Sequence, residues 1–245
     1  KLVKRGFHVI ATMRNLEKAS AIEKITNEQE VLKRIELFHL DVTNQDSINS
    51  FHAKVEALGR VDTLINNAGI AIGGFAEQVN LQAYRRQYDT NVFGLMAVTQ
   101  AVLPTMRKAN SGTIINISSI SGKVAFPGLS PYVSSKHAVE GYSESLRLEV
   151  KPFGIQVALV EPGSYQTNIW SAAQISEQSL EEGSPYFDYM KRIQKHLTAG
   201  EKNYGDPKEV VALICRLASK KKIKKLRHPI GRRVRTMLVL KQWLP

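Results

Sequence analysis

The chain has 245 residues, of which 43% are hydrophobic and 23% charged, so it is long enough and ordinary enough in composition for one large globular domain. It contains no apolar run of about eighteen residues, which excludes a predicted membrane-spanning helix. The single cysteine, Cys215, excludes an internal disulfide and fits a reducing, cytoplasmic location, while the net charge of +12 leaves anionic partners open.

Short apolar runs alternate with segments of helical character along the chain. The apolar runs predict strands at 7–12, 35–40, 61–66, 113–118 and 155–161. The predicted helices span 15–26, 47–58, 81–108, 132–150 and 206–219. Strands that are apolar throughout are typical of a parallel sheet buried on both faces. We therefore expect one α/β domain over residues 1–245, a doubly wound, Rossmann-like parallel sheet with helices on both faces.

The segment 164–205 breaks this alternation. It is polar, has short helical patches, and carries the aromatic residues Tyr165, Trp170, Tyr186, Phe187 and Tyr189. A long irregular segment that follows a strand end in an α/β sheet is where a substrate lid lies. The alternative is a packed helical excursion that covers part of the core, and the two interpretations are compatible.

Tyr132 and Lys136 are four residues apart on a predicted helix and therefore share one face. A neighbouring cation favours the phenolate and lowers a tyrosine pKa from about 10, so the pair suits proton transfer. Ser119 ends the preceding strand and could bond the same substrate oxygen. Ser118 is its rival, because adjacent strand side chains point to opposite faces. By itself, a Tyr and a Lys at this spacing are more often a half-buried tyrosine and a solvated lysine.

Further motifs accompany this pair. Asn66-Asn67-Ala68-Gly69 follows one predicted strand, Asn91-Val92-Phe93-Gly94 lies in a predicted helix, and Pro162-Gly163 ends another strand. In order and spacing they resemble the short-chain dehydrogenase/reductase family, from Phe7 to about Asp206. The resemblance implies reversible hydride transfer between a nicotinamide cofactor and a carbonyl or secondary alcohol.

The resemblance also assigns catalytic roles. Tyr132 exchanges a proton with the substrate oxygen, and Ser119 holds that oxygen. Lys136 tunes the pKa of Tyr132 and binds the nicotinamide ribose. Asn91 orders a water that links Lys136 to solvent. The family spacing selects Ser119 over Ser118.

Cofactor-binding positions follow from the same resemblance. No acidic side chain stands at Thr12, Met13 or Arg14 to bind the ribose hydroxyls of NAD, whereas Arg14 suits the 2′-phosphate of NADP. We therefore expect NADP in preference to NAD, although Arg14 could also be a plain surface residue. The other implied positions are Asp41, Val42, Asn66, Ala68 and Gly69 toward the adenosine side, Tyr132 and Lys136 at the ribose, and Pro162, Gly163 and Thr167 beside the nicotinamide amide.

One family feature is absent from the sequence. Family members begin with a strand and a glycine-rich turn, Thr-Gly-x-x-x-Gly-x-Gly, which holds the cofactor pyrophosphate at a helix N-terminus. Gly69, Gly73 and Gly74 have a different spacing. The resemblance places the absent strand in mid-sheet, between the strands of Val9 and Leu64. We expect about 20 residues of strand and turn before Lys1, and no activity without them.

The substrate and partners are less specified. The fragments 11–14, 136–141 and 161–163 look most like the hydroxysteroid and retinol dehydrogenase branch, which favours apolar alcohols and ketones. The family resemblance also implies a homodimer or homotetramer.

A catalytically silent dinucleotide-binding regulator is an alternative function, but the Tyr132–Lys136 motif is intact. The histidines show no metal-ligand spacing.

Positive charge crowds one stretch near the C-terminal end of the chain. Its residues are Lys220, Lys221, Lys222, Lys224, Lys225, Arg227, Arg232, Arg233 and Arg235. We interpret it as a solvated helix end and loop, because no nucleic-acid motif accompanies it. A nucleic-acid-binding surface or loose peripheral contact with anionic membrane remains open.

Overall fold

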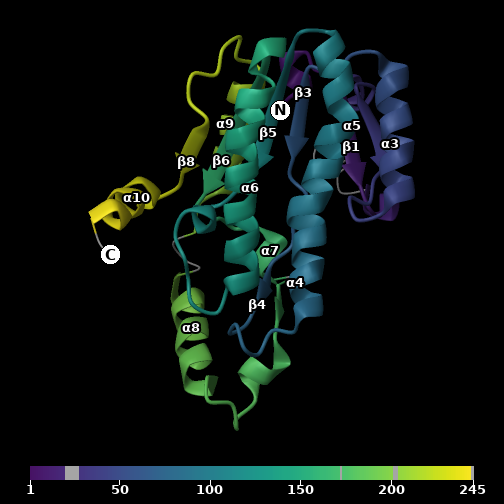
Figure 1. The fold of residues 1–245 in the computed structure, drawn as a ribbon. Coiled ribbons are helices and arrows are strands. Elements are labelled where there is room, and N and C mark those ends of the chain that lie inside the picture. Colours follow the sequence, from purple (N-terminus) through teal and green to yellow (C-terminus); the bar gives the residue numbers. More distant parts are fainter. Residues whose placement is uncertain (20–27, 172, 201–203, 244–245) are drawn as a thin grey trace.

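The computed structural model describes residues 1–19, 28–171, 173–200 and 204–243. Its principal strands run parallel in two separate sheets (Figure 1). One sheet pairs β1 with β2, and the other has the order β3-β5-β6-β8. The strand bounds are β1 Val9–Met13, β2 Ile35–His39, β3 Thr63–Asn66, β5 Gly112–Ile117, β6 Ile155–Pro162 and β8 Arg227–Ile230. A short parallel pair, β4 Ile72–Gly73 with β7 Gln174–Ile175, lies apart from both sheets.

Helices cover both faces of the four-stranded sheet, as predicted (Figure 1). On β5, Ile114 packs toward helices α3, α5 and α6, whereas its neighbour Ile115 packs toward α9. This alternation buries both faces of the strand, which is why its sequence is apolar throughout. The helix bounds are α2 Gln29–Leu32, α3 Gln45–Leu58, α4 Leu81–Tyr88, α5 Gly94–Lys108, α6 Ser130–Glu149, α7 Asn168–Ser171, α8 Phe187–Gly200, α9 Pro207–Ala218 and α10 Val234–Trp243.

Local signals set several helix ends. The Asn44 side chain accepts a hydrogen bond from Ser47 N at the start of α3, and Gly59 ends that helix in the left-handed conformation at φ 65°. The Asp206 side chain caps α9 by accepting from Lys208 N, with Pro207 in the first turn. These side chains and turns place α3 and α9 against the sheet where the sequence predicted them.

Two predicted helices differ from expectation, and two further elements were not predicted. The helix expected over 81–108 is interrupted by a π-helical turn, Asp89–Phe93, between α4 and α5. The helix expected over 15–26 appears as a short 3-10 turn, Leu16–Ala19, and its later part lies outside the described residues. Strand β8 and helix α10 were not predicted, because Arg-His-Pro-Ile is neither apolar nor alternating and the surrounding charge suggested a loop.

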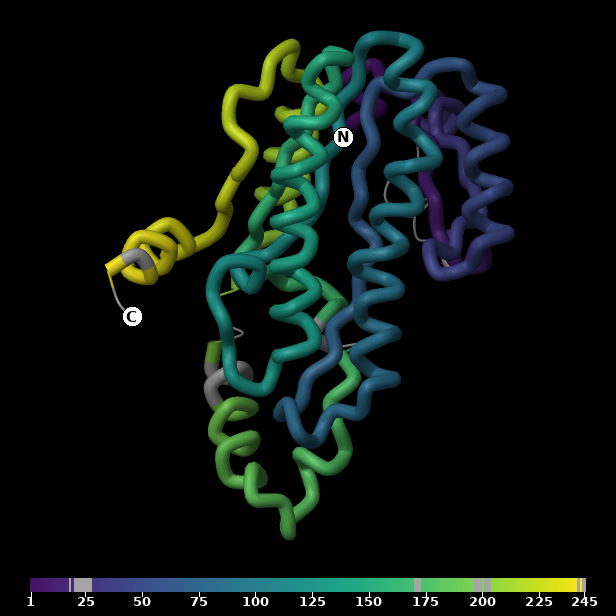
Figure 2. The backbone as a smooth tube through the Cα atoms, in the orientation of Figure 1, coloured from purple at the N-terminus to yellow at the C-terminus, as the bar shows by residue number. Residues whose placement is uncertain are grey.

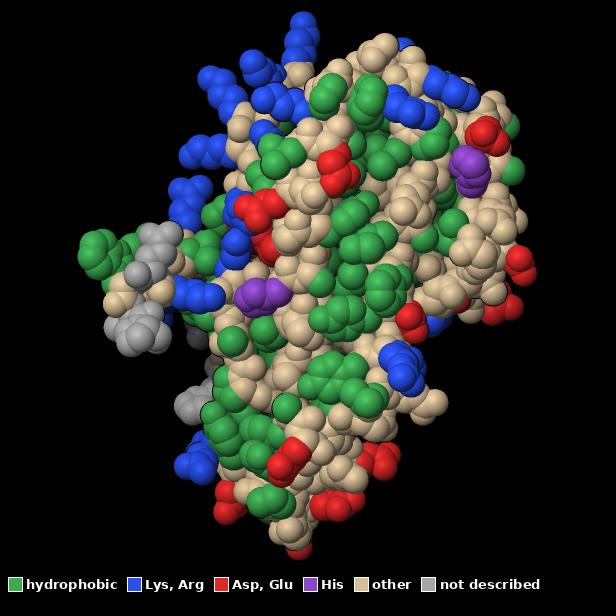
Figure 3. All heavy atoms as spheres, in the orientation of Figure 1, with side chains coloured by type: hydrophobic (Ala, Val, Ile, Leu, Met, Phe, Trp, Pro, Cys, Tyr) green, Lys and Arg blue, Asp and Glu red, His purple; other side chains and the backbone are tan. Residues whose placement is uncertain are grey.

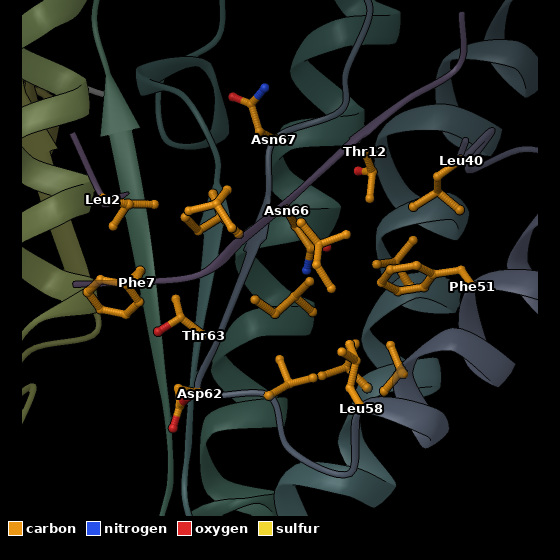
Figure 4. A pocket seen from close by; sticks show the side chains of 18 of the residues that line it. Leu2, Phe7, Thr12, Leu40, Phe51, Leu58, Asp62, Thr63, Asn66 and Asn67 are labelled. Carbon is orange, nitrogen blue, oxygen red and sulfur yellow. The ribbon is translucent and has the colours of Figure 1, made fainter. Parts of the chain in front are cut away.

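The two sheets are separated by a gap between β1 and β3. A cavity of about 580 Å³ lies there, lined by residues of both strands and of α3 and α5. Figure 4 shows Phe7, Leu40, Phe51 and Thr63 around it. The gap therefore lies between the strands of Val9 and Leu64.

The segment after β6 extends beyond the carboxyl ends of the strands, as the backbone trace shows (Figure 2). It is bonded to the segment before α4 through the Gln78 side chain. Gln78 Nε2 donates to Ser184 Oγ at 2.6 Å, and Gln78 Oε1 accepts from Ser179 Oγ at 2.8 Å. Ser176 Oγ also donates to the Gln78 carbonyl. In the described part of this segment, the polar residues that suggested a loop therefore form its anchoring contacts.

No described helix is both long and apolar enough to cross a bilayer.

Candidate active site

Tyr132, Ser119 and Lys136 meet at the carboxyl edge of the sheet, where β5 ends and α6 begins. Tyr132 is 4% exposed and Ser119 is 7% exposed. Burial raises the pKa of Tyr132, and a hydrogen bond with Ser119 lowers it by a smaller amount. The net direction is opposite to the expected lowering by Lys136, because burial outweighs the effect of the neighbouring groups. The Tyr132 phenol therefore keeps its proton at neutral pH in this structure.

Lys136 lies on the same face of α6 as Tyr132, and its ammonium nitrogen is 5.7 Å from the centre of the Tyr132 ring. The ammonium donates to the backbone carbonyl of Ile117 at 2.8 Å. Burial lowers the pKa of Lys136 to about 8, and the Glu140 carboxylate one turn later opposes that shift. An ammonium has three donor hydrogens, so the bond to Ile117 leaves capacity for ribose hydroxyls.

Asn91 lies in the π-helical turn between α4 and α5 and is 1% exposed. Its Oδ1 accepts from Ile70 N at 2.9 Å, and its Nδ2 donates to Ile70 O at 3.0 Å and to Ser135 Oγ at 3.2 Å. Ser135 is next to Lys136 in sequence, so these bonds join the turn to α6. A π-helical turn widens the helix locally and is frequent at functional sites. The structure thus brings Asn91 into contact with α6, the helix that carries Tyr132 and Lys136.

Ser118 and Ser119 have different surroundings in the structure. Ser119 bonds Tyr132 and accepts from Ser121 N, whereas Ser118 turns toward Glu140 on the opposite side. A Cβ added at Gly122 would lie 2.8 Å from Ser118 Oγ and 2.9 Å from Glu140 Cγ. Ser118 Oγ is buried, and among the described residues it has no hydrogen-bond partner. Only Ser119 therefore reaches the phenol.

Arg14 and Asp41 lie together at the carboxyl edge of the β1–β2 sheet. Asp41 Oδ1 accepts from the backbone N and the side-chain hydroxyl of Thr43, and these bonds together with the positive charge of Arg14 lower the pKa of Asp41. Val42 packs closely on Gly94, where an added Cβ would lie 2.7 Å from Val42 Cγ2. The predicted adenosine-side residues Arg14, Asp41 and Val42 are thus neighbours, with a guanidinium and a carboxylate on the same edge.

The Asn66 segment is divided between two roles. The Asn66 amide turns inward and donates to Thr99 Oγ1 at 2.9 Å and Asn116 Oδ1 at 2.8 Å. Ala68 and Gly69 are exposed, and Gly69 backs onto Asn91. The structure therefore leaves Ala68 and Gly69 available to a ligand and places the Asn66 side chain in a buried polar chain.

Pro162 is the last residue of β6, and Gly163 and Thr167 follow it. Gly163 N donates to Ile230 O at 2.9 Å, which ties this turn to β8. Thr167 is exposed immediately before α7. These residues lie on the same sheet edge as Ser119, because β5 and β6 are adjacent and parallel. The residues present fit the adenosine and nicotinamide-ribose ends of a dinucleotide, while the cavity between β1 and β3 separates those ends.

Sequence reasoning missed two buried polar groups near the site. Gln87, which is fully buried, accepts from Ile72 N at 2.8 Å and donates to Ile70 O at 2.8 Å, so it fixes the segment that Asn91 also holds. A glutamine within a predicted helix gave no signal for this role. The second group is a cluster of two carboxylates and an arginine behind Lys136.

In that cluster, Glu140 and Glu161 are 3% and 1% exposed. Arg227 Nε lies 2.9 Å from Glu140 Oε2 and 3.5 Å from Glu161 Oε1. Neither Glu161 oxygen has a hydrogen-bond partner among the described residues. Burial, and then the negative charge of Glu140, raise the pKa of Glu161 to about 7. A protonated Glu161 beside an ionised Glu140 relieves the repulsion between two buried carboxylates.

This raised pKa predicts a pH effect on stability. Between about pH 4.5 and 7 the folded state keeps a proton on Glu161 that the unfolded state has released, so stability from this group falls as pH rises through that window. Glu161→Gln is expected to gain stability relative to the wild type as pH rises across it. Thermal unfolding midpoints of both proteins from pH 4.5 to 7.5 test this.

Glu144→Gln is the matched control, because Glu144 binds the same arginine at 2.9 Å from a partly exposed position and its pKa is lowered. It should not gain stability with rising pH. A constant difference between Glu161→Gln and wild type across the window would contradict the assignment of the proton to Glu161.

Known proteins are similar to this chain in sequence and in fold. Residues 1–178 match the family model described as short chain dehydrogenase. The chain is 48% identical over 242 residues to the uncharacterized oxidoreductase YusZ of Bacillus subtilis, covering 98% of this chain and 86% of that protein. It is 39% identical over 218 residues to the 3-ketodihydrosphingosine reductase of Bacteroides thetaiotaomicron, covering 88% of this chain and 80% of that protein.

Solved structures agree with the sequence relatives. A short-chain dehydrogenase from Streptomyces avermitilis superposes with a TM-score of 0.82 at 35% identity, over 98% of this chain and 86% of that one. ElxO with NADP bound superposes with a TM-score of 0.77 at 27% identity, over 95% of this chain and 90% of that one. The matched residues include the Ser119, Tyr132 and Lys136 segments described above. On sequence and structure together, the chain belongs to the short-chain dehydrogenase/reductase family.

Proposed function

We propose that this protein transfers a hydride between NADP and an apolar carbonyl compound or secondary alcohol. The observation that supports this best is the meeting of Ser119 and Lys136 at the buried phenol of Tyr132. A bound nicotinamide would supply or accept the hydride. Tyr132 would pass its proton to the substrate oxygen as that oxygen gains negative charge, and Ser119 would hold the oxygen by a hydrogen bond.

The electrostatics favour Tyr132 as an acid in the reduction direction. Burial keeps its proton on the phenol, so a donor is always present at neutral pH. Once the proton has left, the phenolate lies near the Lys136 ammonium, whose attraction stabilises it. Asn91, fixed by Ile70 and Ser135, would order a water through which Lys136 recovers a proton from solvent.

NADP is preferred over NAD in this proposal because Arg14 stands beside Asp41 with no acidic side chain at 12–14. ElxO, a structural relative, was solved with NADP bound. Arg14→Ala is expected to weaken NADPH binding by about tenfold and leave NADH binding unchanged, because the charge-assisted bond reaches only the 2′-phosphate. Titration of both cofactors by fluorescence, on the longest form of the protein that can be produced, measures this.

Arg34→Ala is the matched control for that experiment. Arg34 is also exposed, but it precedes β2 and so lies at the opposite end of the strand from Asp41. It should leave the affinity for both cofactors unchanged. Equal losses for NADPH and NADH in Arg14→Ala would show that Arg14 does not read the 2′-phosphate.

We propose residues 164–205 as the substrate lid, within a single dinucleotide-binding oxidoreductase domain. Tyr186 stacks on Phe75 with ring centres 4.3 Å apart, and Tyr189 lies 5.2 Å from the same ring. This aromatic wall suits an apolar substrate such as those of the hydroxysteroid and retinol dehydrogenase branch. One relative is named as a 3-ketodihydrosphingosine reductase, which also suits an apolar ketone. Trp170 belongs to the same segment, but its side chain lies outside the described residues.

A substrate screen tests the proposal. Steroid, retinoid, aliphatic and long-chain 3-keto substrates would be offered with NADPH or NADP, and the change in cofactor absorbance followed. Turnover of at least one class, lost in Tyr132→Phe, is expected. No turnover of any class by a protein that binds NADPH tightly would favour a catalytically silent regulator instead. Cytoplasmic location and a homodimer or homotetramer complete the proposal, by analogy with the family.

A further inference from the structure

Helix α10 projects from the body of the molecule at the end of β8 (Figure 1). It is attached through Val234, which is 4% exposed and packs against Gly163, where an added Cβ would lie 2.6 Å from Val234 Cγ2. Leu238, one turn later on the same side, is half-buried. The helix is therefore held by this side and by Lys241, whose ammonium donates to the backbone carbonyl of Lys123.

The outward side of α10 is apolar. Met237, Val239, Leu240 and Trp243 are 38%, 55%, 51% and 82% exposed. At about 100° per residue, these four side chains fall on one arc of roughly 160°, opposite Val234 and Leu238, and the exposed Thr236 is the one polar residue that the described structure places within it. Four large exposed apolar side chains on one arc are not the scattered single residues that a monomer surface normally shows.

Basic side chains border this arc. On the same helical projection, Arg235 falls at one edge of the apolar arc and Lys241 at the other. Exposed Arg232 and Arg233 precede the helix, and the sequence from 219 to 243 contains no Asp or Glu. Figure 3 shows Lys and Arg side chains gathered along the adjoining edge of the molecule. The basic residues on the loop before β8 are Lys220, Lys221, Lys222, Lys224 and Lys225.

We propose that α10 and the exposed basic residues around it form a docking surface for an anionic lipid bilayer. These residues are Lys220, Lys221, Lys222, Lys224, Lys225, Arg232, Arg233 and Arg235. An apolar arc bordered by Lys and Arg is the pattern of a helix that lies in the membrane interface, with the apolar side chains among the acyl chains and the cations at the headgroups. Trp243 suits the boundary between headgroups and acyl chains. The long side chains of Arg232, Arg233 and Arg235 are exposed beside the arc, whereas the Lys241 ammonium donates to the backbone carbonyl of Lys123.

Charge argues against a second copy of the chain as the partner. A symmetric dimer through α10 would bring two such basic stretches face to face, and like charges across an interface disfavour association. Duplex DNA would satisfy the positive charge, but its phosphates offer nothing to cover the apolar arc. An anionic bilayer satisfies both features at once.

Vesicle binding tests the proposal without reference to enzymatic activity. The protein, with Trp170→Phe so that Trp243 is the only tryptophan, would be mixed with vesicles of phosphatidylcholine alone or of phosphatidylcholine and phosphatidylserine in equal parts. Sedimentation should show at least about tenfold tighter binding to the anionic vesicles, weakened by high salt. Trp243 fluorescence should shift to shorter wavelength on binding.

Two sets of variants assign the binding to this surface. Leu240→Ser with Val239→Ser removes part of the arc, and Arg232, Arg233 and Arg235→Gln removes three charges; each should lower binding by at least about fivefold. The matched control neutralises Arg34, Arg107 and Lys108, which are equally exposed elsewhere. It should bind nearly as the wild type, and all variants should keep the wild-type unfolding midpoint because Val234 and Leu238 are retained.

Several outcomes would overturn the proposal. Equal binding to both vesicle types, or equal losses in the control and the Arg232, Arg233 and Arg235 variant, would mean that α10 is not the docking surface. Self-association abolished by the Val239 and Leu240 substitutions, without vesicle binding, would identify a second copy as the partner. Salt-sensitive binding to duplex DNA as tight as that to anionic vesicles would favour nucleic acid.

Discussion

Tyr132→Phe is expected to lower kcat by about 10²–10⁴-fold, because it removes the proton that the substrate oxygen receives. Affinity for NADPH should stay close to that of the wild type, since the ring is buried and still packs. Steady-state kinetics and a separate NADPH titration, on the longest form of the protein that can be produced, measure the two effects.

Two further variants sharpen this experiment. Lys136→Ala should lower both kcat and NADPH affinity, because the ammonium is assigned to the ribose as well as to the phenolate. Tyr142→Phe, on the same helix, removes a hydroxyl that bonds Thr99 away from the site and should leave kcat unchanged. Turnover by Tyr132→Phe within about tenfold of wild type would refute the assigned proton donor.

The contacts among the candidate catalytic residues could be predicted because they depend on local geometry. A spacing of four residues places Lys136 and Tyr132 on the same face of a helix. Adjacent strand residues point to opposite faces, which separates the side chains of Ser118 and Ser119. The direction of the shift in the Tyr132 pKa could not be predicted, because it depends on how deeply the fold buries the phenol. The inward turn of Asn66 was also hidden, since its partners Thr99 and Asn116 come from distant parts of the chain.

The second large effect concerns cofactor binding. A polypeptide limited to residues 1–245 is expected to bind NADPH weakly or not at all and to show no turnover. Arg14 and Asp41 are proposed for the adenosine end and Lys136 for the nicotinamide ribose, but a pyrophosphate between them requires backbone amides at a helix N-terminus. In the described structure a cavity of about 580 Å³ lies between those ends instead.

Adding a strand and a glycine-rich turn before Lys1 is the direct test. The extended protein should bind NADPH measurably by fluorescence titration, prefer it to NADH, and regain turnover. A control extension of equal length with the turn glycines replaced by alanine should bind poorly, because the close approach of backbone to phosphate is lost. Tight binding by residues 1–245 alone would mean that other groups hold the pyrophosphate.

The fold followed from periodicity where the strands are buried on both faces, as in β5 and β6. The prediction from periodicity failed at β8. There Arg227 pairs with the buried carboxylates Glu140 and Glu161, and in the sequence such a residue cannot be told from an arginine on the surface. The π-helical turn at Asn91 was equally hidden, because one extra residue in a helical turn leaves the sequence pattern almost unchanged.

The gap between β1 and β3 also separates two units, the first around the β1–β2 sheet and the second around the four-stranded sheet, and we expect the first to open more easily than the second. No hydrogen bond of a sheet ladder joins β1–β2 to the other described strands, so the first unit is held mainly by the packing of Ile48, Phe51 and Val55 of α3 against α5. Opening of that unit breaks side-chain packing but no ladder of the main sheet. Its amides should therefore exchange with solvent through a local opening that costs less than global unfolding. A strand seated in the gap would join both ladders and make the sheet unfold as one.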